Sequence, residues 1–151
     1  MSSARGCSLD KALQATVQGL MEKARAKLAA AEDWLAQGKY FDEIASRCYY
    51  AAFHAAQAML ATEGLAANTH QGIVSLFGLH FAKTGRVNPR LGRYLNNLKD
   101  DRESGDYDLY SGLDKSDAEN AVRETREFLT EAERYLQSFL AAPPEGGTSV
   151  Q

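Results

Sequence analysis

The sequence predicts an all-α fold, a five-helix bundle with an up-down core of four long helices. Three observations predict this fold. Apolar residues recur every three to four positions through most of the chain, glycines and helix-capping residues divide these periodic segments, and no segment alternates apolar and polar residues as a strand would. A chain of 151 residues is most simply one domain, and it is long enough to form a single hydrophobic core.

The first two helices are predicted to be antiparallel neighbours. Residues 10–37 carry one apolar stripe, and Gly38 provides a C-terminal stop for this helix. The residues before it, 1–9, are expected to be a flexible N-terminus. The second helix should start near residues 40–41 and end before Gly64, which suits a left-handed position after a helix.

Capping residues mark the next two helices. Asn68 and Thr69 can cap a third helix, which has an apolar face and ends near Gly85. Asn88 followed by Pro89 is a strong start signal for the fourth helix, because Asn caps well and Pro fits the first helical position.

The fourth helix is predicted to end near Arg102. Residues 103–114 then break the helical period with glycines, serines and aspartates, so they are expected to form a partly docked loop. Ser116 and Glu119 form a capping-box pair at the start of a long final helix. The domain therefore spans residues 10–140, and the Pro/Gly-rich tail, residues 141–151, is expected to be disordered.

Composition narrows the class of protein. Lys and Arg number 17 against 20 Asp and Glu, for a net charge of −3, which argues against a wholly basic nucleic-acid coat but allows a local basic patch. The first residues contain no apolar signal core, and no segment approaches about 18 uninterrupted apolar residues, so a cytoplasmic protein without a membrane span is expected. Cys7 and Cys48 form no zinc or disulfide pattern, and the three histidines have no metal-ligand spacing, so neither a metal nor another cofactor is predicted.

The segment SRCYYAAFHAA, residues 46–56, has the strongest functional pattern. Arg47 and His54 are seven residues apart and project from one stripe of the second helix, which Glu43 and Tyr50 share. Two interpretations are open. In the structural one, Glu43 pairs with Arg47 and His54 is a hydrogen-bonded core residue. In the functional one, Arg47 holds a phosphate and His54 moves protons.

Two further groups of polar residues are candidate binding sites. Six basic residues lie between positions 83 and 102 against two acidic ones, and Arg86, Arg90 and Arg93 among them either bind phosphate or form a solvated helix face. Arg102, Asp106 and Tyr107 form the second group. An Arg–Asp pair there could pin the loop to the bundle, or these residues could converge with the second helix on one cleft.

The strings SRCYYAAFHAAQAML, THQGIVSLFGLHFAKTG and RESGDYD together resemble the HEPN domain family. The motifs cover residues 41–108, and the order of helices extends the resemblance over nearly the whole chain. The resemblance implies a small helical bundle that commonly forms a homodimer. It also implies a toxin–antitoxin-like pair with a nucleotidyltransferase partner, as for many members of the family.

Some members of that family are metal-independent endoribonucleases whose signature is an Arg, four to six residues, and a His. Six residues separate Arg47 from His54. The resemblance thus implies that Arg47 would polarise the phosphate and that His54 would act as general acid or base, with two copies of the pair facing each other across the two-fold axis of the dimer.

Three functions of different class follow for this chain. The first is a nucleotide-, RNA- or partner-binding module that uses Tyr50, Arg102, Asp106 and Tyr107 together with the basic segment. The alternative is a metal-independent endoribonuclease that uses Arg47 and His54. The second alternative is a structural dimeric bundle without a ligand, whose polar stripe serves dimer specificity.

Overall fold

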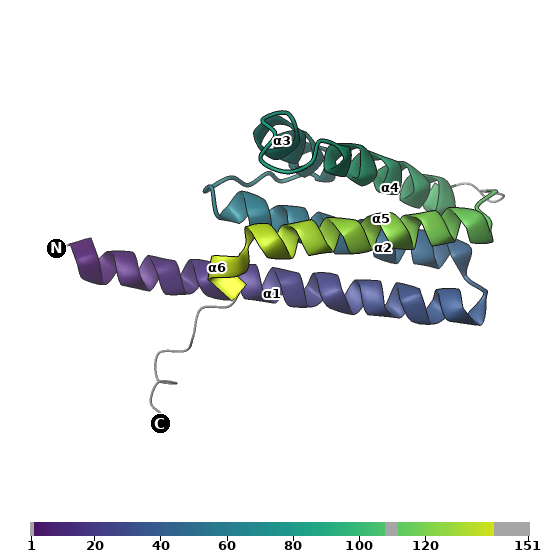
Figure 1. The fold of residues 1–151 in the computed structure, drawn as a ribbon, viewed down its shortest axis with the longest axis horizontal. Helices are drawn as coiled ribbons and strands as arrows, with labels where there is room; N and C mark the ends of the chain where they lie inside the picture. Colours follow the sequence, from purple (N-terminus) through teal and green to yellow (C-terminus); the bar gives the residue numbers. More distant parts are fainter. Residues whose placement is uncertain (1, 108–111, 141–151) are drawn as a thin grey trace, which may run out of the picture.

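The central helix of the fold, α2 (Phe41–Ala61), contacts four other helices, and α1 (Ser2–Gln37) runs antiparallel along it (Figure 1). The computed structural model describes the backbone of residues 2–107 and 112–140 and the side chains of residues 10–105 and 112–140. The remaining elements are α3 (His70–Phe77), the π-helix η1 (Gly78–Ala82), α4 (Arg90–Tyr107), α5 (Lys115–Tyr135) and α6 (Gln137–Leu140). No strand occurs in the described part of the chain, which confirms the all-α prediction.

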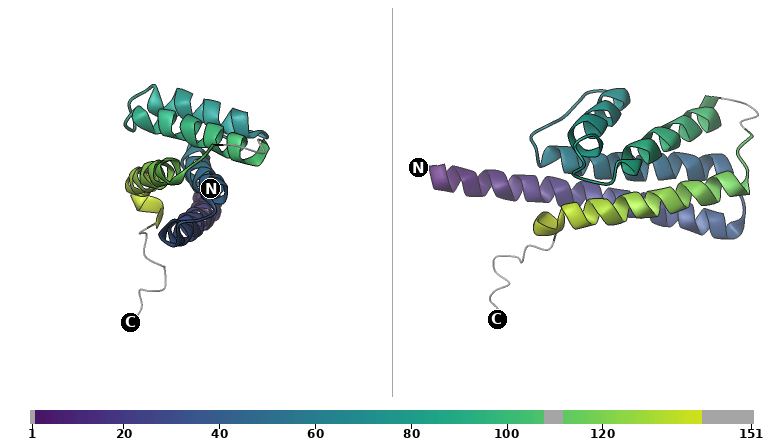
Figure 2. Two further views of the ribbon diagram at one scale, coloured as in Figure 1. Left: turned by 90° about the vertical axis from the view of Figure 1, so that its right-hand side faces the viewer. Right: turned by 45° about the horizontal axis from the view of Figure 1, so that its top comes forward.

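The four long helices alternate in direction, as predicted for an up-down core. Figure 2 shows α3 and α4 in one layer and α1 in another, with α2 between them and α5 alongside. The alanines of α2 explain its central place, because small side chains allow neighbouring helices to approach closely. Its buried alanines are Ala45, Ala51, Ala52, Ala55, Ala56 and Ala58.

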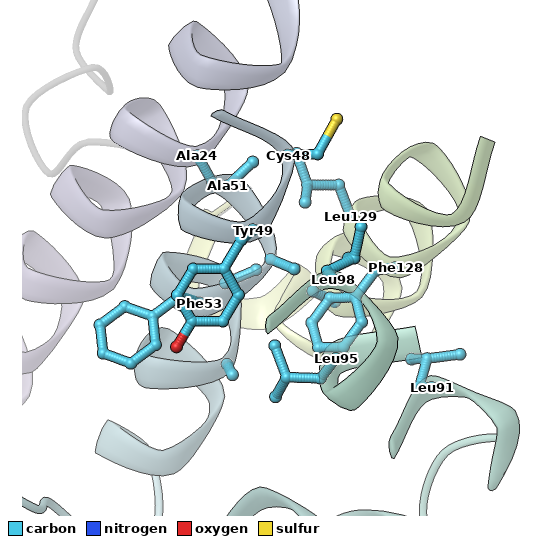
Figure 3. Packing of buried hydrophobic residues seen from close by; sticks show 14 of the residues in the cluster. Ala24, Cys48, Tyr49, Ala51, Phe53, Leu91, Leu95, Leu98, Phe128 and Leu129 are labelled. Carbon is cyan, nitrogen blue, oxygen red and sulfur yellow. The ribbon is translucent and has the colours of Figure 1, made fainter. Parts of the chain in front are cut away.

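Side chains from α2, α4 and α5 meet in the hydrophobic core (Figure 3). Phe128 of α5 packs against Phe77 with ring centroids 5.1 Å apart, and Leu95 and Leu98 of α4 are fully buried beside it. Apart from hydrophobic residues, which include Tyr49 and Cys48, only Thr125 is buried among the described residues, and its hydroxyl donates to the Ala121 carbonyl at 2.8 Å. The Thr125 hydroxyl is therefore hydrogen-bonded within the core.

Most predicted helix ends agree with the structure. Gly38 and Gly64 follow α1 and α2 with φ values of 71° and 70°, which a side chain would disfavour. The Thr69 hydroxyl caps α3 by accepting from the Gly72 amide at 2.9 Å. The Asn88 side chain accepts from the amide of Arg90, the first residue of α4, at 3.0 Å.

Three predicted ends differ from the structure. The first helix begins at Ser2 instead of residue 10, so the helical pattern extends into the expected flexible N-terminus. The fourth helix continues to Tyr107 through the predicted loop, whose residues 108–111 lie outside the described residues. The capping box of α5 consists of Asp114 and Asp117 instead of Ser116 and Glu119, because Asp114 is the residue with extended backbone before the helix.

The predicted tail, residues 141–151, also lies outside the described residues. Among the described helices, none combines the length and the apolar composition that crossing a bilayer requires.

Candidate functional site

Arg47 and His54 line one cavity of about 240 Å³ between α1 and α2. The other side of this cavity is formed by Lys23, Ala26 and Lys27 of α1. None of its described lining residues is acidic. We call this space the α1–α2 cavity. It gathers three permanent cations and one histidine at the contact of α1 with α2.

The charge of Arg47 is not neutralised by a carboxylate of the described residues. Its guanidinium carbon lies 5.3 Å from the centre of the Trp34 ring, a cation–π contact that leaves the positive charge in place. The predicted Glu43–Arg47 ion pair is not among the salt bridges of the described residues, and Glu43 is exposed. Lys23 and Lys27 likewise form no ion pair with a described residue.

His54 is half-buried, and its Nδ1 lies 3.0 Å from Oε1 of Gln57. Because an amide oxygen only accepts, this contact assigns the proton to Nδ1 and the lone pair to Nε2. Burial lowers the pKa of His54, the charges of Lys23 and Lys27 lower it further, and the hydrogen bond to Gln57 opposes them. The imidazole is therefore neutral at pH 7, the state in which it can accept a proton.

A second group of rings joins α2 to α3 and α4. The buried Tyr49 hydroxyl is 2.9 Å from Nδ1 of His70, and His70 stacks on Phe53 with ring centroids 4.3 Å apart. The guanidinium of Arg102 lies 5.3 Å from the centre of the Tyr50 ring. Burial lowers the pKa of His70, and the charge of Arg102 adds to this effect.

This aromatic group lies beside His54, whose ring centre is 6.3 Å from that of Tyr50 and 5.9 Å from that of Phe53, but its members do not line the α1–α2 cavity. Tyr50 and Arg102 are in contact with each other, but neither is among the described residues that line the α1–α2 cavity. The side chains of Asp106 and Tyr107 lie outside the described residues. The structure thus brings together Arg47 and His54, and places Arg102 in the aromatic group.

The basic segment is largely neutralised by neighbouring acids. Arg86 donates to Glu63 at 2.9 Å and to the Tyr135 hydroxyl at 2.6 Å, and Arg90 forms an ion pair with Glu127. Lys99 pairs with Glu103 at 2.7 Å. Arg93 instead lines a separate cavity together with Lys83.

A group of metal ligands and a reactive cysteine are not found in the part of the chain that the structure describes. There, no group of three or more His, Cys, Asp or Glu side chains could hold a metal ion. Burial raises the pKa of the Cys48 thiol to about 12, so this side chain next to Arg47 in sequence stays protonated in the core.

Lys23 and Lys27 are the site residues that the sequence analysis missed. The pattern that could have indicated them is the i,i+4 spacing of the two lysines, which places both on one face of the first helix with Ala26 between them. Nothing in the sequence alone aligned this face with Arg47 and His54.

Comparisons with known proteins identify a family model and several relatives. Residues 17–135 match the family model described as the HEPN domain. The chain is 31% identical over 122 residues to a protein of Methanocaldococcus jannaschii named "Putative toxin MJ0142", covering 81% of this chain and 82% of that protein. It is 30% identical over 132 residues to "Putative toxin MJ0605" of the same organism, covering 87% and 97% of the two chains. A Gloeobacter violaceus protein, UPF0332 protein glr0978, is 36% identical over 120 residues, which cover 79% of this chain and 94% of that protein.

Proposed function

Because the chain belongs to the HEPN domain family, we propose that it is a toxin-like RNA-binding protein whose α1–α2 cavity takes a phosphodiester of single-stranded RNA. One observation carries this proposal. Lys23, Lys27 and Arg47 converge on a single cavity without an ion-pair partner among the described residues. The two relatives with toxin names agree with a function directed at another macromolecule.

Phosphate is the chemistry that this cavity fits. The planar guanidinium of Arg47 can donate two parallel hydrogen bonds to phosphate oxygens, and the Trp34 ring beneath it restricts its orientation. The two lysines act as mobile point charges on the opposite wall. A negatively charged backbone that enters this space would exchange its counterions for three protein cations.

The second candidate function is metal-independent cleavage of the bound RNA, and the neutral His54 in the same cavity favours it. Nε2 of His54 would take the proton of a ribose 2′-hydroxyl as the 2′-oxygen attacks the adjacent phosphorus. The bond to the 5′-oxygen then breaks, giving a 2′,3′-cyclic phosphate and a 5′-hydroxyl. Arg47 would stabilise the charge that develops on the phosphate oxygens.

The 5′-oxygen must gain a proton as it leaves. The proton that His54 has taken from the 2′-hydroxyl would reach it through solvent, and in the arrangement that the family resemblance implies a second copy of the Arg47–His54 pair would face the same phosphate across a two-fold axis. A homodimer is thus part of the cleavage proposal, and a nucleotidyltransferase is the proposed partner of a toxin-like chain. RNA binding itself requires neither.

Binding and cleavage are tested separately with a labelled single-stranded RNA and no added metal. Fluorescence anisotropy should show binding by the wild type, weaker binding by Arg47→Ala, and near-normal binding by His54→Ala. A gel assay should show cleavage only by proteins that retain His54. Sedimentation should show the dimer in every variant that is compared.

A matched control variant distinguishes the effect of the cavity's open space from the effect of its charge. Ala26→Leu fills the α1–α2 cavity from its exposed wall without changing any charge. Weak RNA binding by this variant would support a phosphate inside the cavity. Unchanged binding by both Ala26→Leu and Arg47→Ala would overturn the proposed RNA site, and circular dichroism would verify the fold of each variant.

A further inference from the structure

A second cavity, of about 370 Å³, lies between the π-helix η1 and the first turns of α4. In Figure 1 these elements belong to the layer of α3 and α4, whereas α1 lies on the other side of α2. We call this space the η1–α4 cavity. Its described lining residues are Gly78, Ala82, Lys83, Pro89, Gly92, Arg93, Asn96 and Asn97.

The two helical glycines of this cavity differ in what they do for the fold. A Cβ at Gly92 would lie 3.0 Å from the Cβ of Ala82, so the close packing of α4 against η1 explains that glycine. A Cβ at Gly78 would meet nothing within 4 Å, although glycine is unfavourable inside a helical segment. Packing within the described chain therefore gives no reason for Gly78, but its absent side chain keeps the cavity open.

Two positively charged side chains lie at the rim of the η1–α4 cavity. Lys83 and Arg93 are exposed, form no ion pair with a described residue, and both line this cavity. Their basic neighbours Arg86, Arg90 and Lys99 are each paired with a glutamate. No acidic side chain is among the described lining residues, so an approaching carboxylate would meet two available cations.

The polar groups of the cavity suit a peptide. Nδ2 of Asn96 donates to the Gly92 carbonyl at 3.0 Å, which leaves its Oδ1 as an acceptor for an N–H group. The first amides of α4 already donate to Asn88 and Pro89, so this helix end offers no free amide for a phosphate. The described lining also lacks an aromatic ring on which a nucleobase would stack.

We propose that the η1–α4 cavity docks an acidic segment of a partner protein in an extended conformation. An aliphatic side chain of that segment occupies the space that Gly78 leaves open. Carboxylates next to it bind Lys83 and Arg93, and a backbone N–H donates to Oδ1 of Asn96.

A library of random peptides displayed on phage is the probe. Selection on the full chain should enrich peptides that carry an aliphatic residue flanked by Asp or Glu, and synthetic copies of these peptides should bind in fluorescence anisotropy. Gly78→Leu should weaken this binding by about tenfold or more, because the introduced side chain occupies the place of the anchor. Charge reversal by Lys83→Glu with Arg93→Glu should weaken it to a similar extent.

Two matched controls accompany these variants. Gly19→Leu alters another helical glycine whose Cβ meets nothing within 4 Å, but it lies on α1, away from this cavity. Lys115→Glu with Arg123→Glu changes two exposed cations of α5 by the same net charge. Both controls should bind the selected peptides like the wild type.

Four results would overturn the proposal. They are enrichment of basic or purely apolar peptides, no enrichment at all, equal peptide binding by Gly78→Leu and the wild type, and a loss of dimer in Gly78→Leu that assigns the cavity to a second copy. Weaker RNA binding by the Lys83→Glu, Arg93→Glu variant would assign it to RNA instead. Failure of RNA binding through Arg47 would leave the peptide result unaffected, so the two proposals are tested independently.

Discussion

The salt dependence of RNA binding gives a quantitative test of the α1–α2 cavity. Lys23, Lys27 and Arg47 are its three permanent cations, and we expect Arg47 to neutralise the phosphate inside the cavity and the two lysines to neutralise its neighbours along the strand. Each phosphate that is neutralised on a single strand contributes about −0.7 to the slope of log affinity against log salt. The cavity should therefore contribute a slope of about −2 at a pH at which His54 is neutral. Between about 50 and 200 mM salt, the affinity should fall roughly twentyfold.

The double substitution Lys23→Ala, Lys27→Ala leaves Arg47 as the cation of the cavity. For this variant, the slope of log affinity against log salt should become shallower by about 1.4, so the same salt range should reduce its affinity for RNA only about threefold. Fluorescence anisotropy with one RNA oligonucleotide across a salt series measures both slopes. The control Lys115→Ala, Arg123→Ala removes the same charge from exposed positions of α5 and should keep the wild-type slope. An unchanged slope in the Lys23, Lys27 variant would refute the reasoning.

Three further predictions concern stability and reactivity. Burial lowers the pKa of His54 and of His70 in the folded chain. As the pH drops below about 6.5, the unfolded chain therefore binds more protons than the folded chain, and the free energy of unfolding should fall. Urea denaturation measures this, and a constant midpoint from pH 7 to about 5 would contradict it. Asp114→Ala should lower the free energy of unfolding by about 1 kcal/mol through loss of the α5 cap, whereas an unchanged midpoint would show that the cap is dispensable. Cys48 should react with a thiol reagent only when the chain unfolds, because the side chain is fully buried and its thiol stays protonated. Mass spectrometry measures the labelling, and rapid labelling of Cys48 in the folded chain would contradict this prediction.

The boundaries of the helices could be predicted where one residue type determines the backbone. Gly38 and Gly64 adopt positive φ, and Thr69 has the extended backbone of a cap. Gly105 shows where this reasoning fails, since the sequence predicts a loop at this residue but it lies within α4. A Cβ there would be 3.3 Å from the Cβ of Asp42, so close approach of α4 to α2 accounts for this glycine, and sequence alone does not distinguish that use from a turn.

Only the α2 side of the candidate site could be predicted from the sequence, because the α1 side depends on how the two helices pack. Helical geometry alone places Arg47 and His54 on one stripe, because both belong to the same helix. Lys23 and Lys27 depend on how far α1 slides along α2 and how it is rotated, which the packing of many core side chains determines together. The ion pairs of Arg86 and Arg90 were unpredictable in the same sense, because Glu63 and Glu127 belong to other segments of the chain.

The alanine-rich contact of α1 and α2 explains how the cavity can exist in a stable bundle. Ala24 and Ala31 of α1 are fully buried, as is Ala51 of α2, and such small side chains bring the two helices close together. That close approach also brings the cations of both helices to one cavity, where they repel one another. A carboxylate at the position of Ala26 would relieve this repulsion, yet the described lining contains none. A bound phosphate would supply the missing negative charge, and it should therefore raise the melting temperature of the protein as it binds.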